Sequence, residues 1–476
     1  MSTISHKSYL LFLALVFSFG LANWSNTTLV AQSRGDMIVV TIDYDTKIED
    51  REVDKVYAGG VHRVIDINGN WCALQDVKGW IHKRYCLSTR MAKEQFSKRI
   101  KDNARDFDAW VTRGMIYLEE GDLKLAFRDI NESLRINPRR ASFWNNRGLV
   151  YMQMNQIDLA IKDIGYAIRL APKYANAFNN RGMCHYAKGD HQNAIADYSE
   201  AISLKDDFPS FYVNRGVALQ ALGKTSEAMD DFNAALRIRR NIPEAYIGRS
   251  NLLLSRGDLT RARDNATEAI RLDPKASEGY NNRGWIRYKT NDIKGATEDF
   301  EKALELDAEF SNAHSNLGVL LTDQGEYRDA LVHLNRSLEL DPSSALAFTN
   351  RANAWLGLGE YDKAKADFDK ALTMAPTNAD ALNGKAWFQA TCSKEEYRDG
   401  EAALEMAEKA CTTSGMRNWS HVDTLAAAHA ENGDFEKAIE YEEKAISIAP
   451  KSKKKICQER LANYQDNKPT RTDSGQ

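Results

Sequence analysis

The sequence is poor in cysteine, in net charge and in clustered histidine. Six cysteines in 476 residues are too few for a disulfide framework. With 64 basic and 67 acidic residues the chain is nearly neutral, so bulk electrostatics does not recruit nucleic acid or an anionic membrane. The nine histidines are scattered, without the spacing of metal ligands. We therefore expect no nucleic-acid partner, no small-molecule cofactor and no metal site.

Catalytic motifs are also lacking. The sequence has no phosphate-cradling glycine loop, no serine nucleophile elbow and no separated pair of carboxylates outside its repeats. No unassigned stretch is long enough for a catalytic domain. These absences predict that the protein is not an enzyme.

The first 22 residues have the features of an export signal. His6 and Lys7 precede an apolar run from Tyr9 to Ala22, which is short for a membrane span and ends in a plausible cleavage site. We expect an exported protein that is periplasmic or associated with the cell envelope. The alternative is a protein anchored by an uncleaved signal segment.

Residues 35–90 change to short runs of strand-like sequence with Gly59-Gly60 and Asn68-Gly69 between them. The stretches Gly69-Asn70-Trp71 and Lys78-Gly79-Trp80-Ile81 resemble a bacterial SH3-like domain, which implies a small all-β barrel. Its aromatic residues either form the core or line a surface for a peptide or a cell-wall or envelope component. Cys72 and Cys86 are either paired or free. A linker or helix is predicted for residues 91–106.

A 34-residue period organises the rest of the chain. The residues Asn145-Asn146-Arg147-Gly148 recur at 179–182 and at 281–284, and a frame laid from Phe107 gives eight units without a gap up to Asn378. Position 8 is small, position 20 is always alanine, and position 15 is always glycine or asparagine. Small residues allow two helices to approach closely, and glycine or asparagine closes a helix in the left-handed conformation. Each unit is thus predicted to be helix, tight turn, helix.

This pattern resembles the tetratricopeptide repeat. The family's characteristic positions are occupied in the second unit by Trp144, Gly148, Tyr151, Ala160, Ile164, Ala167 and Pro172. The resemblance implies a mainly α fold, a right-handed α-solenoid of about ten helix hairpins over residues 107–452, of which the last two are irregular. We expect a capping helix over 453–465 and a disordered tail over 466–476.

Comparison of the units also predicts an internal ion pair. Position 7 is arginine in seven of the eight units and position 23 is aspartate in six, while the seventh unit has lost both, with Leu317 and His333. We expect the arginine to bind the aspartate of its own unit. The six predicted pairs are Arg113 with Asp129, Arg147 with Asp163, Arg181 with Asp197, Arg215 with Asp231, Arg283 with Asp299, and Arg351 with Asp367.

The resemblance further implies that the first helix of each unit lines a concave groove. Six units have asparagine at position 6, which would form a ladder of amides for the backbone of an extended peptide. The predicted peptide-binding residues are Asn146, Asn180, Asn214, Asn282, Asn316, Asn350, Met183, Tyr186, Trp285 and Tyr288. Alternatively these amides only tie neighbouring helices together.

Function is therefore predicted as a non-catalytic scaffold for a protein or peptide partner. Two alternatives remain open: an accessory subunit of an envelope carbohydrate-active or assembly complex, and a spacer whose repeats only set distance.

Overall fold

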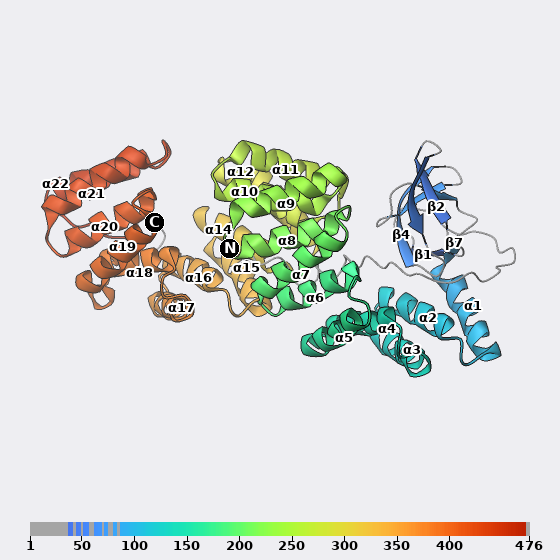
Figure 1. Ribbon diagram of the computed structural model, residues 1–476. Helices are drawn as coiled ribbons and strands as arrows, with labels where there is room; N and C mark the ends of the chain where they lie inside the picture. The colour runs from blue at the N-terminus through green and yellow to red at the C-terminus, as the bar shows by residue number, and fades with distance from the viewer. Residues whose placement is uncertain are drawn as a thin grey trace. The chain divides into compact units, whose positions relative to one another are not determined.

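The structure is a computed structural model that describes residues 37–40, 44–48, 51–56, 61–68, 71–74, 80–82 and 86–472 (Figure 1). The predicted export signal, residues 1–22, lies outside these ranges. The chain divides into two compact units between Leu252 and Leu253, within helix α10 (Pro243–Ser255). Among the described residues, no helix combines the length and apolar character needed to cross a membrane.

In the described residues up to Ser88, seven short strands form a sheet. They are β1 (Met37–Val40), β2 (Tyr44–Ile48), β3 (Arg51–Val56), β4 (Val61–Asn68), β5 (Trp71–Leu74), β6 (Trp80–His82) and β7 (Cys86–Ser88). Their hydrogen-bonded order is β3-β2-β6-β5-β4-β1-β7, with antiparallel neighbours. The SH3-like identity of this region stays a prediction.

Helices make up the remainder of the first unit. Helix α1 (Thr89–Asp102) occupies most of the stretch predicted as a linker or helix. The hairpins that follow are built from α2 (Phe107–Glu119), α3 (Leu123–Ile136), α4 (Ala141–Gln153), α5 (Ile157–Leu170), α6 (Ala175–Ala187), α7 (His191–Leu204), α8 (Pro209–Ala221) and α9 (Thr225–Ile238).

The second unit continues with the same kind of hairpin. Its regular helices are α11 (Leu259–Leu272), α12 (Ser277–Lys289), α13 (Ile293–Leu306), α14 (Ser311–Asp323), α15 (Tyr327–Leu340), α16 (Ala345–Gly357) and α17 (Tyr361–Met374). The irregular end has α18 (Ala379–Thr391), a 3-10 turn η3 (Glu395–Tyr397), α19 (Gly400–Ser414), α20 (Trp419–Glu431), α21 (Phe435–Ile448) and α22 (Lys454–Gln465).

The 34-residue frame determines where these helices begin and how they pack. In each of the eight regular units the first helix begins at position 1 and the second at position 17. The turn residue at position 15 has a positive φ throughout, for example 81° at Gly121 and 58° at Asn155. At position 8, a Cβ on Gly148 would lie only 2.5 Å from Ile164 Cγ1 of the second helix. The close approach of α4 and α5 therefore requires glycine at residue 148.

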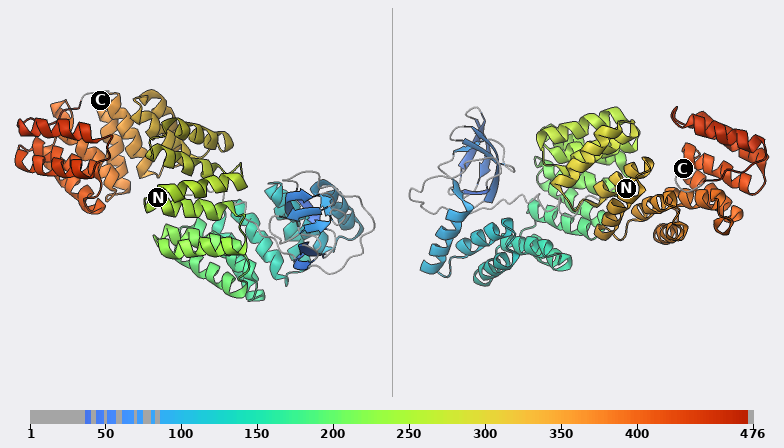
Figure 2. Two further views of the ribbon diagram at one scale, coloured as in Figure 1. Left: turned by 90° about the horizontal axis from the view of Figure 1, so that it is seen from above. Right: turned by 180° about the vertical axis from the view of Figure 1, so that it is seen from behind.

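Contacts between successive hairpins show which helices stack on one another within each compact unit, and Figure 2 shows these helices from two further directions. In the first unit α2, α4, α6 and α8 contact one another in succession, and in the second unit α12, α14, α16, α18 and α20 do the same. Second helices instead contact the first helix that follows them, as α5 contacts α6 and α15 contacts α16. The first helix of each repeat therefore lies on the inner face of its compact unit.

At the C-terminal end, α22 lies against α21 over the predicted capping segment. Within the predicted tail, residues 471 and 472 lie against the end of α18. The Thr472 N–H donates to the Thr391 carbonyl at 2.8 Å, and Arg471 Nη1 lies 2.6 Å from Glu431 Oε2. These contacts hold the segment, and residues 473–476 lie outside the described residues.

Candidate functional site

The arginine at position 7 and the aspartate at position 23 form an ion pair in all six units where both occur. In the second repeat, Arg147 Nε donates to Asp163 Oδ2 at 2.6 Å and Nη2 donates to Asp163 Oδ1 at 3.1 Å, a bidentate geometry. The other pairs have N–O distances of 2.6 to 2.7 Å: Arg113–Asp129, Arg181–Asp197, Arg215–Asp231, Arg283–Asp299 and Arg351–Asp367. All six aspartates are buried, so these pairs, here called the clips, join the two helices of a hairpin.

A further acceptor at position 25 extends several clips to the preceding hairpin. Arg147 Nη1 donates to Asn131 Oδ1 at 2.7 Å, and Arg351 Nη1 donates to Asn335 Oδ1 at 2.8 Å. One arginine thus connects three helices from two repeats. Sequence reasoning missed this acceptor because position 25 varies among the units.

Four of the six position-6 amides are buried, Asn316 and Asn350 are half-buried, and most of the six are bound to the preceding repeat. Asn180 Nδ2 donates to Asn145 Oδ1 at 3.0 Å, and Asn214 Nδ2 donates to Asn179 Oδ1 at 2.9 Å. Equivalent bonds run from Asn316 to Asn281 and from Asn350 to Ser315. Four of the six predicted amides therefore use their donor to hold neighbouring first helices in register.

The two remaining amides have an unused donor. Nδ2 of Asn146 and Nδ2 of Asn282 are buried without a hydrogen-bond partner. In the 34-residue frame, the preceding acceptor position holds Val111 and Ile247 respectively, and neither side chain has an acceptor. These donors are the part of the ladder that the fold leaves unsatisfied.

The predicted groove residues of the first unit are largely packed. Met183 is buried and its Sδ lies 3.6 Å from Asn179 Nδ2. Tyr186 is half-buried, with its ring centroid 4.9 Å from that of His191. This part of the inner face therefore offers the edge of one aromatic ring.

The second unit has a more open group of four side chains, here called the Trp285 patch: Trp285, Tyr288, Lys289 and Asp323. The two rings are half-buried with centroids 5.2 Å apart, and Lys289 Nζ lies 4.7 Å above the Trp285 ring. The Tyr288 hydroxyl donates to Asp323 Oδ2, and burial raises the Tyr288 pKa above its ordinary value. A fixed aromatic surface with a charge of each sign at its edge results.

The seventh repeat replaces the clip with two histidines. His314 Nδ1 lies 3.0 Å from His333 Nδ1, so one ring donates and the other accepts. Burial lowers the pKa of both rings, and the charge of His314 lowers that of His333 further. This pair is neutral where the clips are charged.

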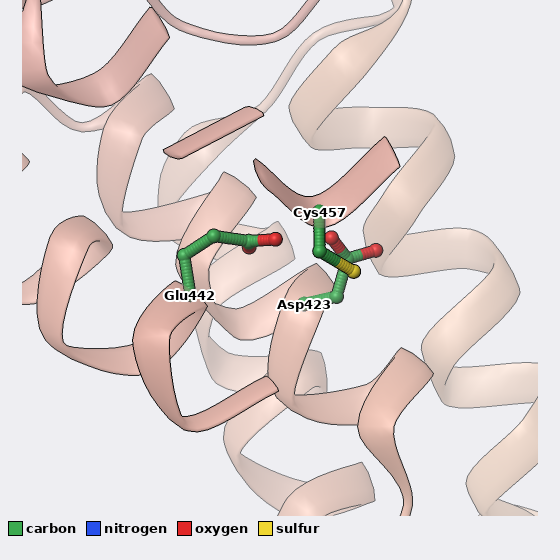
Figure 3. A group of neighbouring side chains, drawn as sticks. All are labelled: Asp423, Glu442 and Cys457. Atoms are coloured by element: carbon green, nitrogen blue, oxygen red, sulfur yellow. The ribbon is translucent and has the colours of Figure 1, made fainter. Parts of the chain in front are cut away.

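A second buried polar cluster lies at the C-terminal end and was missed from the sequence (Figure 3). Asp423 on α20, Glu442 on α21 and Cys457 on α22 converge, and all three are buried. Arg460 of α22 donates from Nη1 to Asp423 Oδ2 at 2.5 Å, and its guanidinium lies 4.3 Å from the Trp387 ring centroid. Three helices are thus joined through one group of side chains, here called the C-terminal cluster.

The electrostatics of the C-terminal cluster are dominated by burial. Burial, and then the neighbouring Asp423, raises the pKa of Glu442 to about 9. Burial also raises the pKa of Cys457 to about 12, and it raises the pKa of Asp423 against the opposing effect of Arg460. The ion pair with Arg460 stabilises the Asp423 carboxylate, and Glu442 has no cation of its own.

Comparison with known proteins agrees with this architecture. A family model described as TPR repeat matches residues 184–223. Models described as Tetratricopeptide repeat match residues 107–140, 141–174, 209–242, 247–309, 311–344, 345–378 and 424–452. The chain is therefore a tetratricopeptide-repeat protein. Among curated proteins, none matches the sequence significantly.

Solved structures with similar folds include a chain of the APC/C hetero-tetramer Cut9-Hcn1, with 18% identity over 56% of this chain and a TM-score of 0.48. The match spans 52% of that chain, about half its length. A tetratricopeptide repeat protein from Parabacteroides merdae has 17% identity over 56% of this chain and 99% of its own, with a TM-score of 0.44. Yeast Tom70 has 15% identity over 79% of this chain and 96% of its own, with a TM-score of 0.36. Similarities at this level carry no argument about function.

Proposed function

We propose that the protein is a non-catalytic scaffold that holds an extended segment of a partner protein against the first helices. Tetratricopeptide repeats typically form scaffolds for protein–protein interaction, and the first helices line the inner face within each unit. The observation that carries the proposal is the Trp285 patch, where two half-buried rings lie on a first helix of that face. Aromatic anchors of this kind contribute much of the energy of binding.

The buried amides take a different part in this proposal. Because Asn180 and Asn214 already donate to the preceding repeat, they position the first helices for the partner. The unused donors of Asn146 and Asn282 are the amide groups available to a peptide carbonyl after a change of side-chain rotamer. The partner is thus recognised by aromatic contact and by a few backbone hydrogen bonds.

We further infer that the protein acts outside the cytoplasm. This inference is supported by the apolar run from Tyr9 to Ala22 and by the resemblance of residues 35–90 to an SH3-like domain, which would attach the scaffold to an envelope component. N-terminal sequencing of the mature protein from fractionated cells tests it. Intact Met1 on soluble cytoplasmic protein would contradict it.

Peptide selection tests the scaffold function. The full chain would be presented to a display library of random peptides, and selected peptides would be measured by fluorescence anisotropy. The double variant Trp285→Ala/Tyr288→Ala should bind them at least about tenfold more weakly, because an aromatic anchor is worth ~2 kcal/mol. Val332→Ala is the matched control, since this apolar side chain is 66% exposed on a second helix of the same unit.

The control should bind like the wild type. Failure to select any peptide, or equal affinity of the double variant and the wild type, would overturn the proposed groove. Loss of affinity in Val332→Ala alone would move the binding surface to the second helices.

A further inference from the structure

The C-terminal cluster brings three side chains with metal-ligand atoms together from three helices. Ligand atoms of Asp423, Glu442 and Cys457 all lie within 4.8 Å of one another. In Figure 3 the Glu442 carboxyl group extends toward Asp423 and Cys457. The exposed fractions are 3% for Asp423 and 0% for both Glu442 and Cys457, so the group is closed off from solvent.

The C-terminal cluster has few partners outside itself. Asp423 Oδ1 and both carboxyl oxygens of Glu442 are buried without a donor from the rest of the protein, since Arg460 reaches only Asp423 Oδ2, and Glu442 has only Asp423 and Cys457 as hydrogen-bonding neighbours. Buried carboxyl oxygens are normally bonded to protein, water or a metal ion, since leaving them unpaired is costly. A fully buried glutamate whose neighbours are an aspartate and a thiol, with no cation of its own, therefore points to a cation that the protein itself does not supply.

We propose that Asp423, Glu442 and Cys457 bind one divalent metal ion of the Zn²⁺ class. A thiolate among carboxylates favours Zn²⁺ over Mg²⁺ or Ca²⁺, which prefer ligand sets made of oxygen alone. Charge supports the same choice, because three anionic ligands are balanced by one divalent ion together with the Arg460 guanidinium. Arg460 also holds the second oxygen of Asp423, as outer partners of metal-binding carboxylates do.

The expectation of no metal site rested on the absence of histidine and cysteine motifs with metal-ligand spacing. The ligands here come from α20, α21 and α22, and packing of α22 completes the set. A metal ion would join the last hairpin to the C-terminal helix and so stabilise the end of the repeat array. This inference is independent of the proposed peptide groove.

Metal titration of the full chain tests the proposal. After treatment with a chelator, the protein would be dialysed against Zn²⁺ and its metal content measured by elemental analysis. We expect one bound equivalent, a higher melting temperature with Zn²⁺ but not with Mg²⁺, and an X-ray absorption spectrum with one sulfur ligand among oxygen ligands. Absence of a stoichiometric ion, or a shell without sulfur, would overturn the proposal and leave a proton shared between the two carboxyl groups.

Variants locate the site. Co²⁺ substitution should give a thiolate-to-metal charge-transfer band that Cys457→Ser abolishes and that Cys411→Ser retains, since Cys411 is a buried free thiol on α19 of the same unit. Glu442→Gln should weaken the affinity for Zn²⁺ at least about tenfold. Circular dichroism would verify folding of each variant. A charge-transfer band that survives in folded Cys457→Ser protein would place the metal elsewhere.

Discussion

The clips and the C-terminal cluster bury charge in different ways. In a clip, one arginine donates two hydrogen bonds to one aspartate, so the charge and the bonding capacity are both largely matched within a repeat. In the C-terminal cluster, one arginine binds only one of two carboxyl groups, and Asp423 Oδ1 and both carboxyl oxygens of Glu442 receive no donor from outside the cluster. The clip recurs in six repeats, where it joins the two helices of the hairpin and so has a structural role. Among the described residues the C-terminal cluster occurs at one place, and its lack of a cation for Glu442 is the observation on which the proposed metal site rests.

Truncation after Ser452 should have the largest effect on stability, because it removes α22 and with it Arg460, the cation of the C-terminal cluster. Without α22, Asp423 loses Arg460, and the alanine-rich surface covered by Tyr464 is exposed. We expect the free energy of unfolding of the last hairpin to fall by about 5 kcal/mol or more. Thermal melting and light scattering would measure the loss of stability and the association that follows.

Truncation after Thr472 is the matched control for this change. It removes only residues 473–476 and keeps the contact of the Thr472 N–H with Thr391. Melting and monodispersity should match those of the full chain. If the chain truncated after Ser452 also melts and remains monodisperse like the full chain, α22 is not needed for stability.

Breaking one clip should have the next largest effect. Arg215→Met leaves Asp231, which is 5% exposed, as a buried carboxylate without its cation. The free energy of unfolding should fall by about 3–5 kcal/mol, whereas Arg215→Met/Asp231→Leu should recover most of this loss. Urea denaturation of both variants measures the difference. Equal losses in the single and double variants would show that packing of the arginine, and not charge burial, is what matters.

The amide ladder allows a comparison within the regular repeats. Asn214→Ala removes the donor to Asn179 Oδ1 and should cost ~1–3 kcal/mol. Asn146→Ala should cost less, because the Asn146 donor has no partner in the fold. Urea denaturation and the affinity for selected peptides would be measured for both. Lost affinity with unchanged stability in Asn214→Ala would assign that amide to the partner instead of to the architecture.

The regular repeats could be predicted from the sequence because each of their features is local or periodic. The turn at Asn155 follows from its place in the frame, and the pairing of Arg147 with Asp163 follows from the joint loss of both residue types in the seventh repeat. The sequence left the partner of Asn180 open between a peptide and a neighbouring helix, because an amide bonds equally well to either.

The C-terminal cluster could not be predicted in this way. Asp423, Glu442 and Cys457 are separated by more than a dozen residues from one to the next, and they lie where the exact repeat frame has ended. Only the packing of α22 against α21 brings the three helices to a common point. Comparison of repeats cannot find a group that occurs once.

The smallest expected effect on stability is at the seventh repeat. There the neutral His314–His333 pair replaces a charged clip, so the pH dependence of stability should differ between the two. Burial lowers the pKa of His314 and His333, and Asp307, Asp329 and Arg336 are the charged groups that act on them. Above the unfolded pKa of about 6.5 both states are neutral and the stability is fully present. As the pH falls through the lowered folded values, the unfolded state binds more protons, so stability is lost.

Denaturation midpoints at about pH 7.5 and about pH 5.5 would measure this loss. Burial also lowers the pKa of His429, so the wild-type slope alone does not isolate the pair. The variant Leu317→Arg/His333→Asp would install a clip in the seventh repeat and should make stability less sensitive to pH, while His333→Asn should remove only the contribution of that ring. An identical pH dependence of the midpoint in the wild type and both variants would contradict the role of the histidine pair, because both variants remove His333, a group that binds a proton more readily in the unfolded state than in the folded state.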